Sequence, residues 1–186
     1  PGDTILLHAA AGGIGLIACQ WAKALGATVI GTAGSEEKAE LARAHGADHV
    51  ILYKTEDVAA RVLELTGGKK VPVVYDGVGK DTLMASLDSL RPRGLLVSFG
   101  NASGPVDNFN VGLLAAKGSL SITRPTLATY VADEASLQAN ANDLFDMVRT
   151  GKVKIEVNQR YRLSEAVNAH RDLAARKTTG STILVP

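Results

Sequence analysis

Short apolar segments alternate with longer amphipathic segments along the first two thirds of the chain. The apolar segments have the length and the β-branched residues typical of strands, whereas the amphipathic segments carry apolar residues at helical spacing. The pattern predicts strands at residues 4–8, 28–32, 49–53, 71–75, 94–99 and 119–123. It predicts helices at residues 13–25, 35–45, 56–65 and 80–90, and a loop at residues 100–110.

The regular alternation of strands and helices indicates a parallel sheet, because parallel strands need crossover connections that are usually helical. The strands are apolar on both faces, which predicts that helices cover both sides of the sheet and that the crossovers are right-handed. The six predicted strands complete the sheet by about residue 125. We therefore predict an α/β fold with a doubly wound parallel (Rossmann) sheet, whose dinucleotide-binding core spans residues 1–125.

The last third of the chain departs from this alternation. A long amphipathic helix is predicted at residues 133–150, with an apolar stripe formed by Leu137, Leu144, Met147 and Val148. A strand at residues 153–162, a helix at 164–176 and a strand at 181–185 follow. Because a dinucleotide-binding domain does not require them, we interpret residues 126–186 as a C-terminal helix and return segment of a larger protein.

A glycine-rich turn lies between the first predicted strand and the first helix. In the Gly-x-Gly-x-x-Gly fingerprint, the first glycine makes the turn, the second admits the pyrophosphate and the third packs the helix on the strand. Here Ala10 takes the first place, which is tolerable only if its φ is negative. We predict that backbone amides at the helix N-terminus bind a diphosphate; the residues are Ala11, Gly12, Gly13, Ile14 and Gly15. A turn that binds no ligand is the alternative.

The tip of the second strand distinguishes NAD from NADP. NAD-binding domains usually place a carboxylate there, which accepts hydrogen bonds from the ribose hydroxyls. The tip here offers Gly34 and Ser35 with Lys38 one turn later, which favours the 2′-phosphate of NADP. Glu36 and Glu37 keep NAD open, and a surface lysine paired with a neighbouring glutamate is the other interpretation of Lys38.

Two further turns follow the fourth and fifth predicted strands, at residues 75–79 and 99–101. Small residues at strand ends allow a ribose and a nicotinamide to lie against the backbone. Asp76 is either a helix cap or a direct ligand contact.

Composition excludes several classes of protein. The chain has 186 residues, a net charge of +1 and no basic run, so nothing indicates nucleic acid or an anionic membrane as the main partner. No segment has the length of a membrane span and no signal sequence precedes the first strand, which makes a cytoplasmic location the expectation. The single cysteine, Cys19, excludes an internal disulfide and a multi-cysteine zinc site, and we interpret it as a packed small hydrophobe.

No catalytic constellation is visible in the sequence. The four histidines stand apart from cysteines and carboxylates at ligand spacing, so we interpret His8, His45, His49 and His170 as structural or surface residues and predict no metal site. Neither a nucleophile elbow nor a Walker lysine motif is present.

Several motifs together resemble one family across essentially all 186 residues. They are HAAAGGIG at residues 8–15, ACQWAKALGA at 18–27, GADHVI at 46–51, VYDGVG at 74–79, GLLVSFGN at 94–101, TRP at 123–125 and GSTILVP at 180–186. The chain is similar to the zinc-free, zeta-crystallin-like NADPH:quinone oxidoreductases of the medium-chain dehydrogenase/reductase superfamily.

This resemblance implies NADPH as cofactor and a quinone or another electron-poor small molecule as substrate. It implies a 2′-phosphate site at Lys38, Tyr53 and Arg176, and a nicotinamide site lined by Gly77, Val78, Phe99, Gly100 and Asn101. It also implies a homodimer that pairs the edge strand near Ser119 to Thr123 with its counterpart.

The resemblance further implies an N-terminal GroES-like domain that forms the other wall of the active site and is absent here. Residues that orient the quinone belong to that domain, so no catalytic residue is assigned, and the chain alone is expected to have little or no activity. Reduction of α,β-unsaturated carbonyls uses the same hydride transfer and is a close alternative. A non-catalytic nucleotide- or RNA-binding module is the alternative from another class, and the near-neutral charge argues against RNA.

Overall fold

The computed structural model describes residues 1–186 and contains a six-stranded parallel sheet with strand order β3-β2-β1-β4-β5-β6. The strands are β1 (Thr4–Leu7), β2 (Thr28–Ala33), β3 (His49–Leu52), β4 (Val71–Asp76), β5 (Leu90–Ser98) and β6 (Ser121–Thr123). The strand order reverses between β1 and β4, which is the topological switch point where doubly wound sheets bind their ligands. The predicted α/β, doubly wound fold is confirmed.

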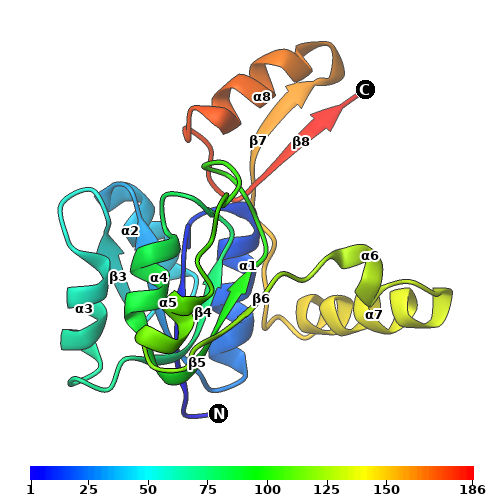
Figure 1. The fold of residues 1–186 in the computed structure, drawn as a ribbon. Helices are drawn as coiled ribbons and strands as arrows, with labels where there is room; N and C mark the ends of the chain where they lie inside the picture. The colour runs from blue at the N-terminus through cyan, green and yellow to red at the C-terminus, as the bar shows by residue number, and fades with distance from the viewer.

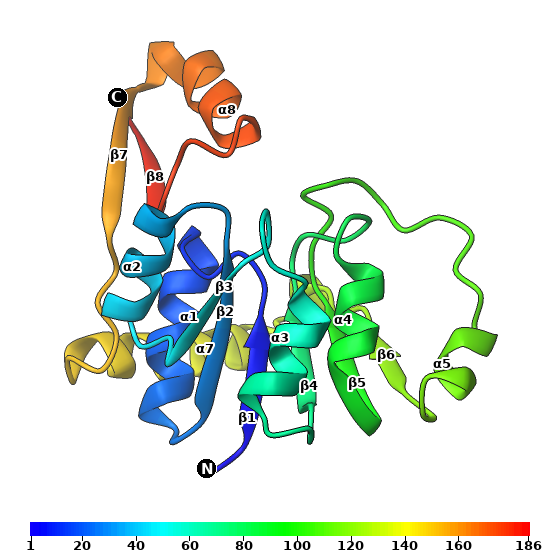
Figure 2. The same ribbon diagram turned by 90° about the vertical axis from the view of Figure 1, so that its left-hand side faces the viewer.

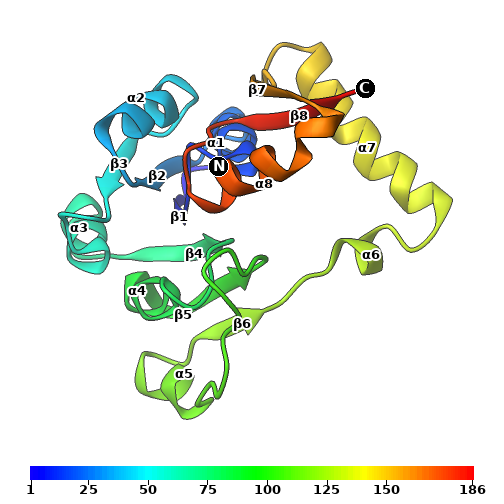
Figure 3. The ribbon, with the colours of Figure 1, turned by 90° about the horizontal axis from the view of Figure 1, so that it is seen from above.

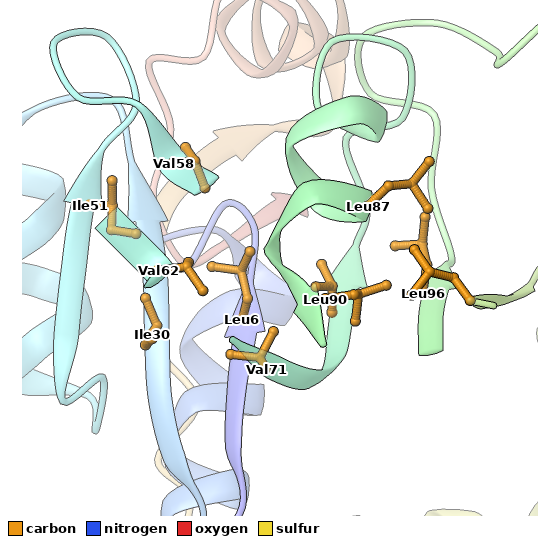
Figure 4. Packing of buried hydrophobic residues seen from close by; sticks show 11 residues of the cluster. Leu6, Ile30, Ile51, Val58, Val62, Val71, Leu87, Leu90 and Leu96 are labelled. Atoms are coloured by element: carbon orange, nitrogen blue, oxygen red, sulfur yellow. The ribbon is translucent and has the colours of Figure 1, made fainter. Parts of the chain in front are cut away.

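Helices lie on both faces of this sheet (Figure 3). They are α1 (Gly13–Ala24) and α2 (Glu36–Ala44) on one face, and α3 (Val58–Leu65), α4 (Leu83–Ser89) and α5 (Gly112–Ala116) on the other. Successive residues of β1 point to opposite faces, so Leu6 and Leu7 belong to two separate cores. The larger core joins Leu6 to Val62 of α3 and Leu87 of α4 (Figure 4), whereas the smaller one joins Leu7 to Cys19 of α1.

The two faces of the sheet are covered unequally. On the face of α1 and α2, no further helix covers β4 and β5, and an apolar cavity of about 460 Å³ remains there. Its walls are Ile5, Leu7, Ile14, Ala18, Trp21, Ala22, Leu25, Tyr75, Val97 and Phe99. The prediction of a sheet covered on both sides therefore holds for one face, because the chain supplies only two helices to the other.

The last third of the chain forms two separate groups of elements (Figures 1 and 2). The elements are α6 (Leu127–Tyr130), α7 (Glu134–Arg149), β7 (Val157–Arg162), α8 (Ala166–Ala174) and β8 (Ser181–Val185), with a 3-10 turn at Leu163–Glu165. Helices α6 and α7 project to one side of the sheet, and α7 buries none of its residues. Strands β7 and β8 pair in parallel and lie with α8 above the sheet. None of the helices combines the length and the hydrophobicity needed to cross a membrane.

The return segment is attached to the core by backbone contacts. The Gln20 side chain makes two hydrogen bonds to the backbone of Lys154, donating to its carbonyl at 2.9 Å and accepting from its amide at 2.8 Å. The Gly180 amide donates to the Ala11 carbonyl at 3.0 Å. A Cβ at Gly13 would lie 3.1 Å from the Gly180 carbonyl oxygen, so the additional glycine of the turn allows the return segment to approach.

Most predicted elements are present with boundaries that move by a few residues. The expected strand at residues 153–162 begins only at Val157, because the preceding residues connect α7 to the core and bury Val153 there. The short helices α5 and α6 were not predicted, since segments of four or five residues carry too little periodicity to be recognised.

A Cβ at Gly15 would lie 2.3 Å from the Ala9 carbonyl oxygen, and backbone atoms cannot move aside cheaply. We therefore expect Gly15→Ala to lower the free energy of unfolding by about 3 kcal/mol, measured by urea denaturation. Gly12→Ala is the matched control within the same turn, because its Cβ would lie at 3.3 Å and its φ of −77° suits alanine. We expect it to cost about 1 kcal/mol. Equal losses for the two variants would contradict this account of the turn.

Candidate dinucleotide site

The turn between β1 and α1 has the backbone that a diphosphate site requires. The residue with positive φ in this turn is Ala9, at +55°. Ala10, in the first place of the fingerprint, is not among the residues with positive φ, as an alanine there requires. The Ala9 amide donates to Thr32 Oγ1 at 3.2 Å and the Ala10 amide donates to the Thr32 carbonyl at 3.0 Å, which ties the turn to β2. The first amides of α1 have no acceptor within the helix, and no acidic residue lies in its first turn. These amides can therefore receive an anion.

The tip of β2 is shaped by Gly34 and Ser35. Ser35 caps α2 as predicted, since its side chain accepts from the Lys38 amide at 3.4 Å. A Cβ at Gly34 would lie 2.6 Å from the hydroxyl of Tyr53, which directly follows β3. Glycine at this position is what allows the Tyr53 ring to lie against the tip of β2.

Lys38 reaches the return segment from α2. Its Nζ donates to the carbonyl oxygens of Arg176 at 2.5 Å and Thr178 at 3.2 Å. No ion pair joins it to Glu37 or Glu40, so the interpretation of Lys38 as half of a surface glutamate pair does not describe the structure. A cavity of about 190 Å³ lies at this junction and is lined by Gly12, Gly34, Lys38, Tyr53 and Arg176 among others.

The electrostatics of this cavity favour an anion. Burial lowers the pKa of Lys38; Glu37 opposes the shift, and the neighbouring positive charges of Lys54 and Arg176 add to it. Lys38 and Arg176 line this cavity and Lys54 lies near enough to act on Lys38, so a bound anion would relieve the repulsion that Lys38 experiences.

A second cavity, of about 430 Å³, adjoins the first and shares Ala9, Tyr53 and Arg176 with it. Val78 lies in its wall on the side of β4. The Arg176 guanidinium lies 3.5 Å from the Asp81 carboxylate, so Arg176 spans from the return segment to the loop after β4. The two cavities together extend from the tip of β2 to the end of β4.

The ends of β4 and β5 approach each other closely. A Cβ at Gly77 would lie 2.8 Å from the ring of Phe99, and a Cβ at Gly100 would lie 2.3 Å from the Gly77 carbonyl oxygen. The structure thus brings Gly77, Phe99 and Gly100 together. Val78 instead faces the cavity shared with Tyr53 and Arg176, and Asn101 is exposed.

Asp76 is buried and caps the loop after β4. Its Oδ1 accepts from the amides of Val78 at 2.8 Å and Gly79 at 3.1 Å, and its Oδ2 accepts from the Ser86 hydroxyl at 2.7 Å. Burial by itself raises the pKa of this carboxyl, but His8, these donors and Thr82 outweigh burial, and the pKa lies below its ordinary value. The helix-cap alternative does not describe Asp76, because it accepts from loop amides that precede α4 and the N-cap residue of that helix is Thr82. Its bond to Ser86 has no counterpart in the sequence pattern.

His8, His45 and Cys19 occupy structural positions, whereas His49 and His170 are exposed. His8 is buried between Thr32 and Ser86, and His45 lies between the Leu41 carbonyl and Glu156 of the return segment. Cys19 is fully buried, and burial raises the pKa of its thiol to about 12, which confirms its interpretation as a packed hydrophobe. Nowhere do three or more His, Cys, Asp or Glu side chains converge as a metal-ligand set.

Comparison with known proteins places this geometry in a known group. Residues 13–145 match the family model described as "Zinc-binding dehydrogenase". The chain is 63% identical over 185 residues to a quinone oxidoreductase of Pseudomonas aeruginosa and 50% identical over 187 residues to a 2-haloacrylate reductase of Burkholderia sp.. Both matches include the whole of this chain but only 57% and 56% of the lengths of the two relatives.

Similarity to solved structures extends to the whole chain. The structure of Escherichia coli quinone oxidoreductase complexed with NADPH matches all of it with a TM-score of 0.97 and 52% identity. The match covers 58% of the Escherichia coli chain. The chain therefore spans a little over half the length of the relatives it matches. The residues present here do not offer a zinc ligand set, although the family description mentions zinc.

The carboxylate of Asp76 stabilises the folded state only while it is ionised. We expect Asp76→Asn to lower the free energy of unfolding by about 2 kcal/mol at pH 7, because it removes a charged acceptor from several buried donors. The native pKa lies below that of the unfolded chain, so the carboxylate's contribution is complete above about pH 4 and is lost as the pH falls through the native pKa. When the free energy of unfolding in urea is measured from pH 7 to pH 3, the values for the parent chain and for Asp76→Asn should converge at the acid end. Asp107→Asn, in an exposed loop, is the control and should change little; a difference for Asp76→Asn that is independent of pH would contradict the assignment.

Proposed function

The chain belongs to the zinc-binding dehydrogenase family, and from this premise we propose that it is the NADPH-binding part of a zinc-independent quinone oxidoreductase. One observation carries the choice of NADPH. Lys38 and Arg176 converge with Tyr53 on a cavity beside the glycine turn, where the tip of β2 offers no carboxylate for an unphosphorylated ribose. The NADPH complex of the Escherichia coli relative supports the same cofactor.

In this proposal the dinucleotide lies across the switch point of the sheet. The amides of Gly13, Ile14 and Gly15 hold the diphosphate, next to Ala11 and to Gly12, whose own amide donates to the Ala9 carbonyl. Lys38, Tyr53 and Arg176, with Ser35 and Gly34 beside them, hold the 2′-phosphate. Gly77, Phe99 and Gly100 at the strand ends, together with Val78 and Asn101, line the path toward the nicotinamide.

The chain's own residues bind and orient, and NADPH supplies the hydride. Transfer of hydride to a quinone needs a positioned nicotinamide and a cleft that holds the acceptor against it. Because Gly77 and Gly100 have no side chains, their backbones approach each other closely and the Phe99 ring lies against Gly77. We assign no catalytic residue to this chain.

A second candidate substrate class comes from the Burkholderia relative. A 2-haloacrylate carries a carbon–carbon double bond conjugated to a carboxylate, and its reduction uses the same hydride. The identities of 63% and 50% favour a quinone as acceptor. Rates with a quinone and with 2-chloroacrylate, measured on the longer protein, distinguish the two.

We also propose that residues 1–125 form the cofactor domain and that residues 126–186 link it to the part of the protein that completes the cleft. The relatives contain more than two fifths of additional chain. The apolar cavity of about 460 Å³ and the uncovered stripe of α7 are surfaces that such additional chain would bury. A location in the cytoplasm remains part of this proposal.

A homodimer through β6 completes the proposal. Strand β6 is the edge of the sheet and all three of its residues are exposed. An edge strand with unpaired backbone groups is a template for a second copy, and pairing there would continue the sheet across the dimer.

Replacing the cations tests the cofactor assignment. We expect Lys38→Ala and Arg176→Ala each to weaken NADPH binding by about tenfold or more, with little effect on NADH, because each removes a charged donor to the 2′-phosphate. Isothermal calorimetry with both nucleotides measures this. Lys69→Ala, an exposed lysine in the turn before β4, is the matched control and should change neither affinity. Parallel losses for NADPH and NADH would place the two cations elsewhere than at the 2′-phosphate.

A charge on the edge strand tests the dimer. We expect Ile122→Lys to shift sedimentation of the chain from dimer to monomer, because a lysine on an edge strand opposes pairing with a second copy. His49→Lys, on the opposite edge of the sheet, should leave the dimer intact. Monomeric sedimentation of the unsubstituted chain would refute the edge-strand dimer for this chain.

A further inference from the structure

A line of buried polar side chains runs beneath the candidate cofactor cavity. His8, the first residue after β1, is 3% exposed and lines the cavity of about 430 Å³. Four of the five buried polar or charged residues of the chain belong to this line: His8, Thr32, Asp76 and Ser86. They come from the ends of β1, β2 and β4 and from α4, so the line crosses the switch point of the sheet.

The ionised Asp76 fixes the direction of one half of the line. A carboxylate only accepts, so the Ser86 hydroxyl donates its single proton to Asp76 Oδ2 at 2.7 Å. Ser86 Oγ can then only accept from His8 Nε2, which lies 3.0 Å away. His8 must therefore carry a proton on Nε2.

The same reasoning fixes the other half. Burial lowers the pKa of His8, although the charge of Asp76 acts in the opposite direction. The lowered pKa favours a neutral ring at pH 7. A neutral ring protonated on Nε2 has a bare Nδ1, which accepts from the Thr32 hydroxyl at 3.2 Å. Thr32 Oγ1 accepts in turn from the Ala9 amide at 3.2 Å. Every proton in the line has one place.

The two ends of the line hold the two walls of the cavity. At one end is Ala9, whose φ of +55° is a strained conformation for alanine and needs support from its surroundings. At the other end Asp76 accepts from the amides of Val78 and Gly79. Ala9 and Val78 both line the cavity of about 430 Å³, so the line of hydrogen bonds connects two parts of its wall.

We propose that His8, as its Nε2-protonated tautomer, is a positioning residue that couples the glycine turn to the loop after β4 through this directed line of hydrogen bonds. Its consequence for cofactor affinity rests on the proposed function. The coupling between the two loops does not. Neither wall keeps its position independently of the other.

The tautomer is tested by nitrogen-15 NMR of the histidine rings. We expect the His8 ring to show a protonated Nε2 and a bare Nδ1 at pH 7 and above. A ring protonated on Nδ1, or on both nitrogens at pH 7, would overturn the proposal, and this result does not depend on nucleotide binding.

The coupling is tested by a double-mutant cycle on hydrogen exchange. Thr32→Val and Ser86→Ala each interrupt one half of the line, and each should accelerate exchange of both the Ala9 and the Gly79 amides. If His8 couples the two halves, the acceleration of exchange in the double variant should be smaller than the product of the two single accelerations by about threefold or more. The shortfall should vanish in a His8→Phe background. Multiplicative effects in the parent background, or acceleration confined to the nearer loop, would overturn the proposal.

NADPH titration of the same variants separates this inference from the proposed function. We expect His8→Phe to weaken NADPH and NADH alike by about tenfold, with His49→Phe as the unaffected control. Intact coupling together with no nucleotide binding by the parent chain would refute the proposed function and leave the coupling standing. Normal binding by His8→Phe would refute its positioning role.

Discussion

The close contact between Gly15 and the backbone of Ala9 and Ala10 is the constraint on which the rest of the structure depends. No side chain fits between the first turn of α1 and the turn that precedes it, where a Cβ would lie 2.3 Å from a carbonyl oxygen. This contact sets the distance of α1 from the sheet and aims its free amides at the edge where the strands end. It also holds the strained Ala9 in place, and both cavities of the candidate site include Ala9 in their walls.

The candidate site is assembled from segments that are far apart in the sequence. Lys38 comes from α2, Tyr53 follows β3, and Arg176 arrives from the return segment after α8. Gly13 allows these segments to meet, because its lack of a side chain lets the backbone of Gly180 approach to contact distance. Gly180 then pairs with Gly12 in an isolated parallel β-bridge. The additional glycine in the fingerprint thus explains how the end of the chain reaches its beginning.

Local pattern was sufficient for the sheet and for the glycine turn. The strands alternate with helices at regular spacing, Ser35 caps α2 as its position predicts, and the comparisons confirm the resemblance to quinone oxidoreductases. Long-range features could not be read in the same way. The place of Arg176 near Lys38 came only from the resemblance, because no local pattern relates residues so far apart.

The polar line through His8 and Ser86 was missed for the same reason. Each of its members lies on a different element and is flanked by apolar residues, so each reads alone as an ordinary core or capping residue. Burial changes that interpretation, because a buried polar group must find a partner and the partners define one another. Asp76 shows the principle, since its sequence position predicts a helix cap, whereas it caps the loop after β4 and its bond to Ser86 depends on where α4 packs.

In the proposed function, discrimination between phosphorylated and unphosphorylated nucleotides depends on how the two cations Lys38 and Arg176 are held. Lys38 donates to neutral carbonyl oxygens of the return segment, and Arg176 reaches Asp81 only at 3.5 Å between exposed side chains. The exposed Arg176–Asp81 pair keeps Arg176 near the cavity at little energetic gain, since such a pair contributes about 0–1 kcal/mol. A phosphate dianion offers each of the two cations a stronger, charge-assisted partner and also screens their mutual repulsion. An unphosphorylated ribose offers neither, so under the proposed function these two residues would supply the selectivity for NADPH over NADH.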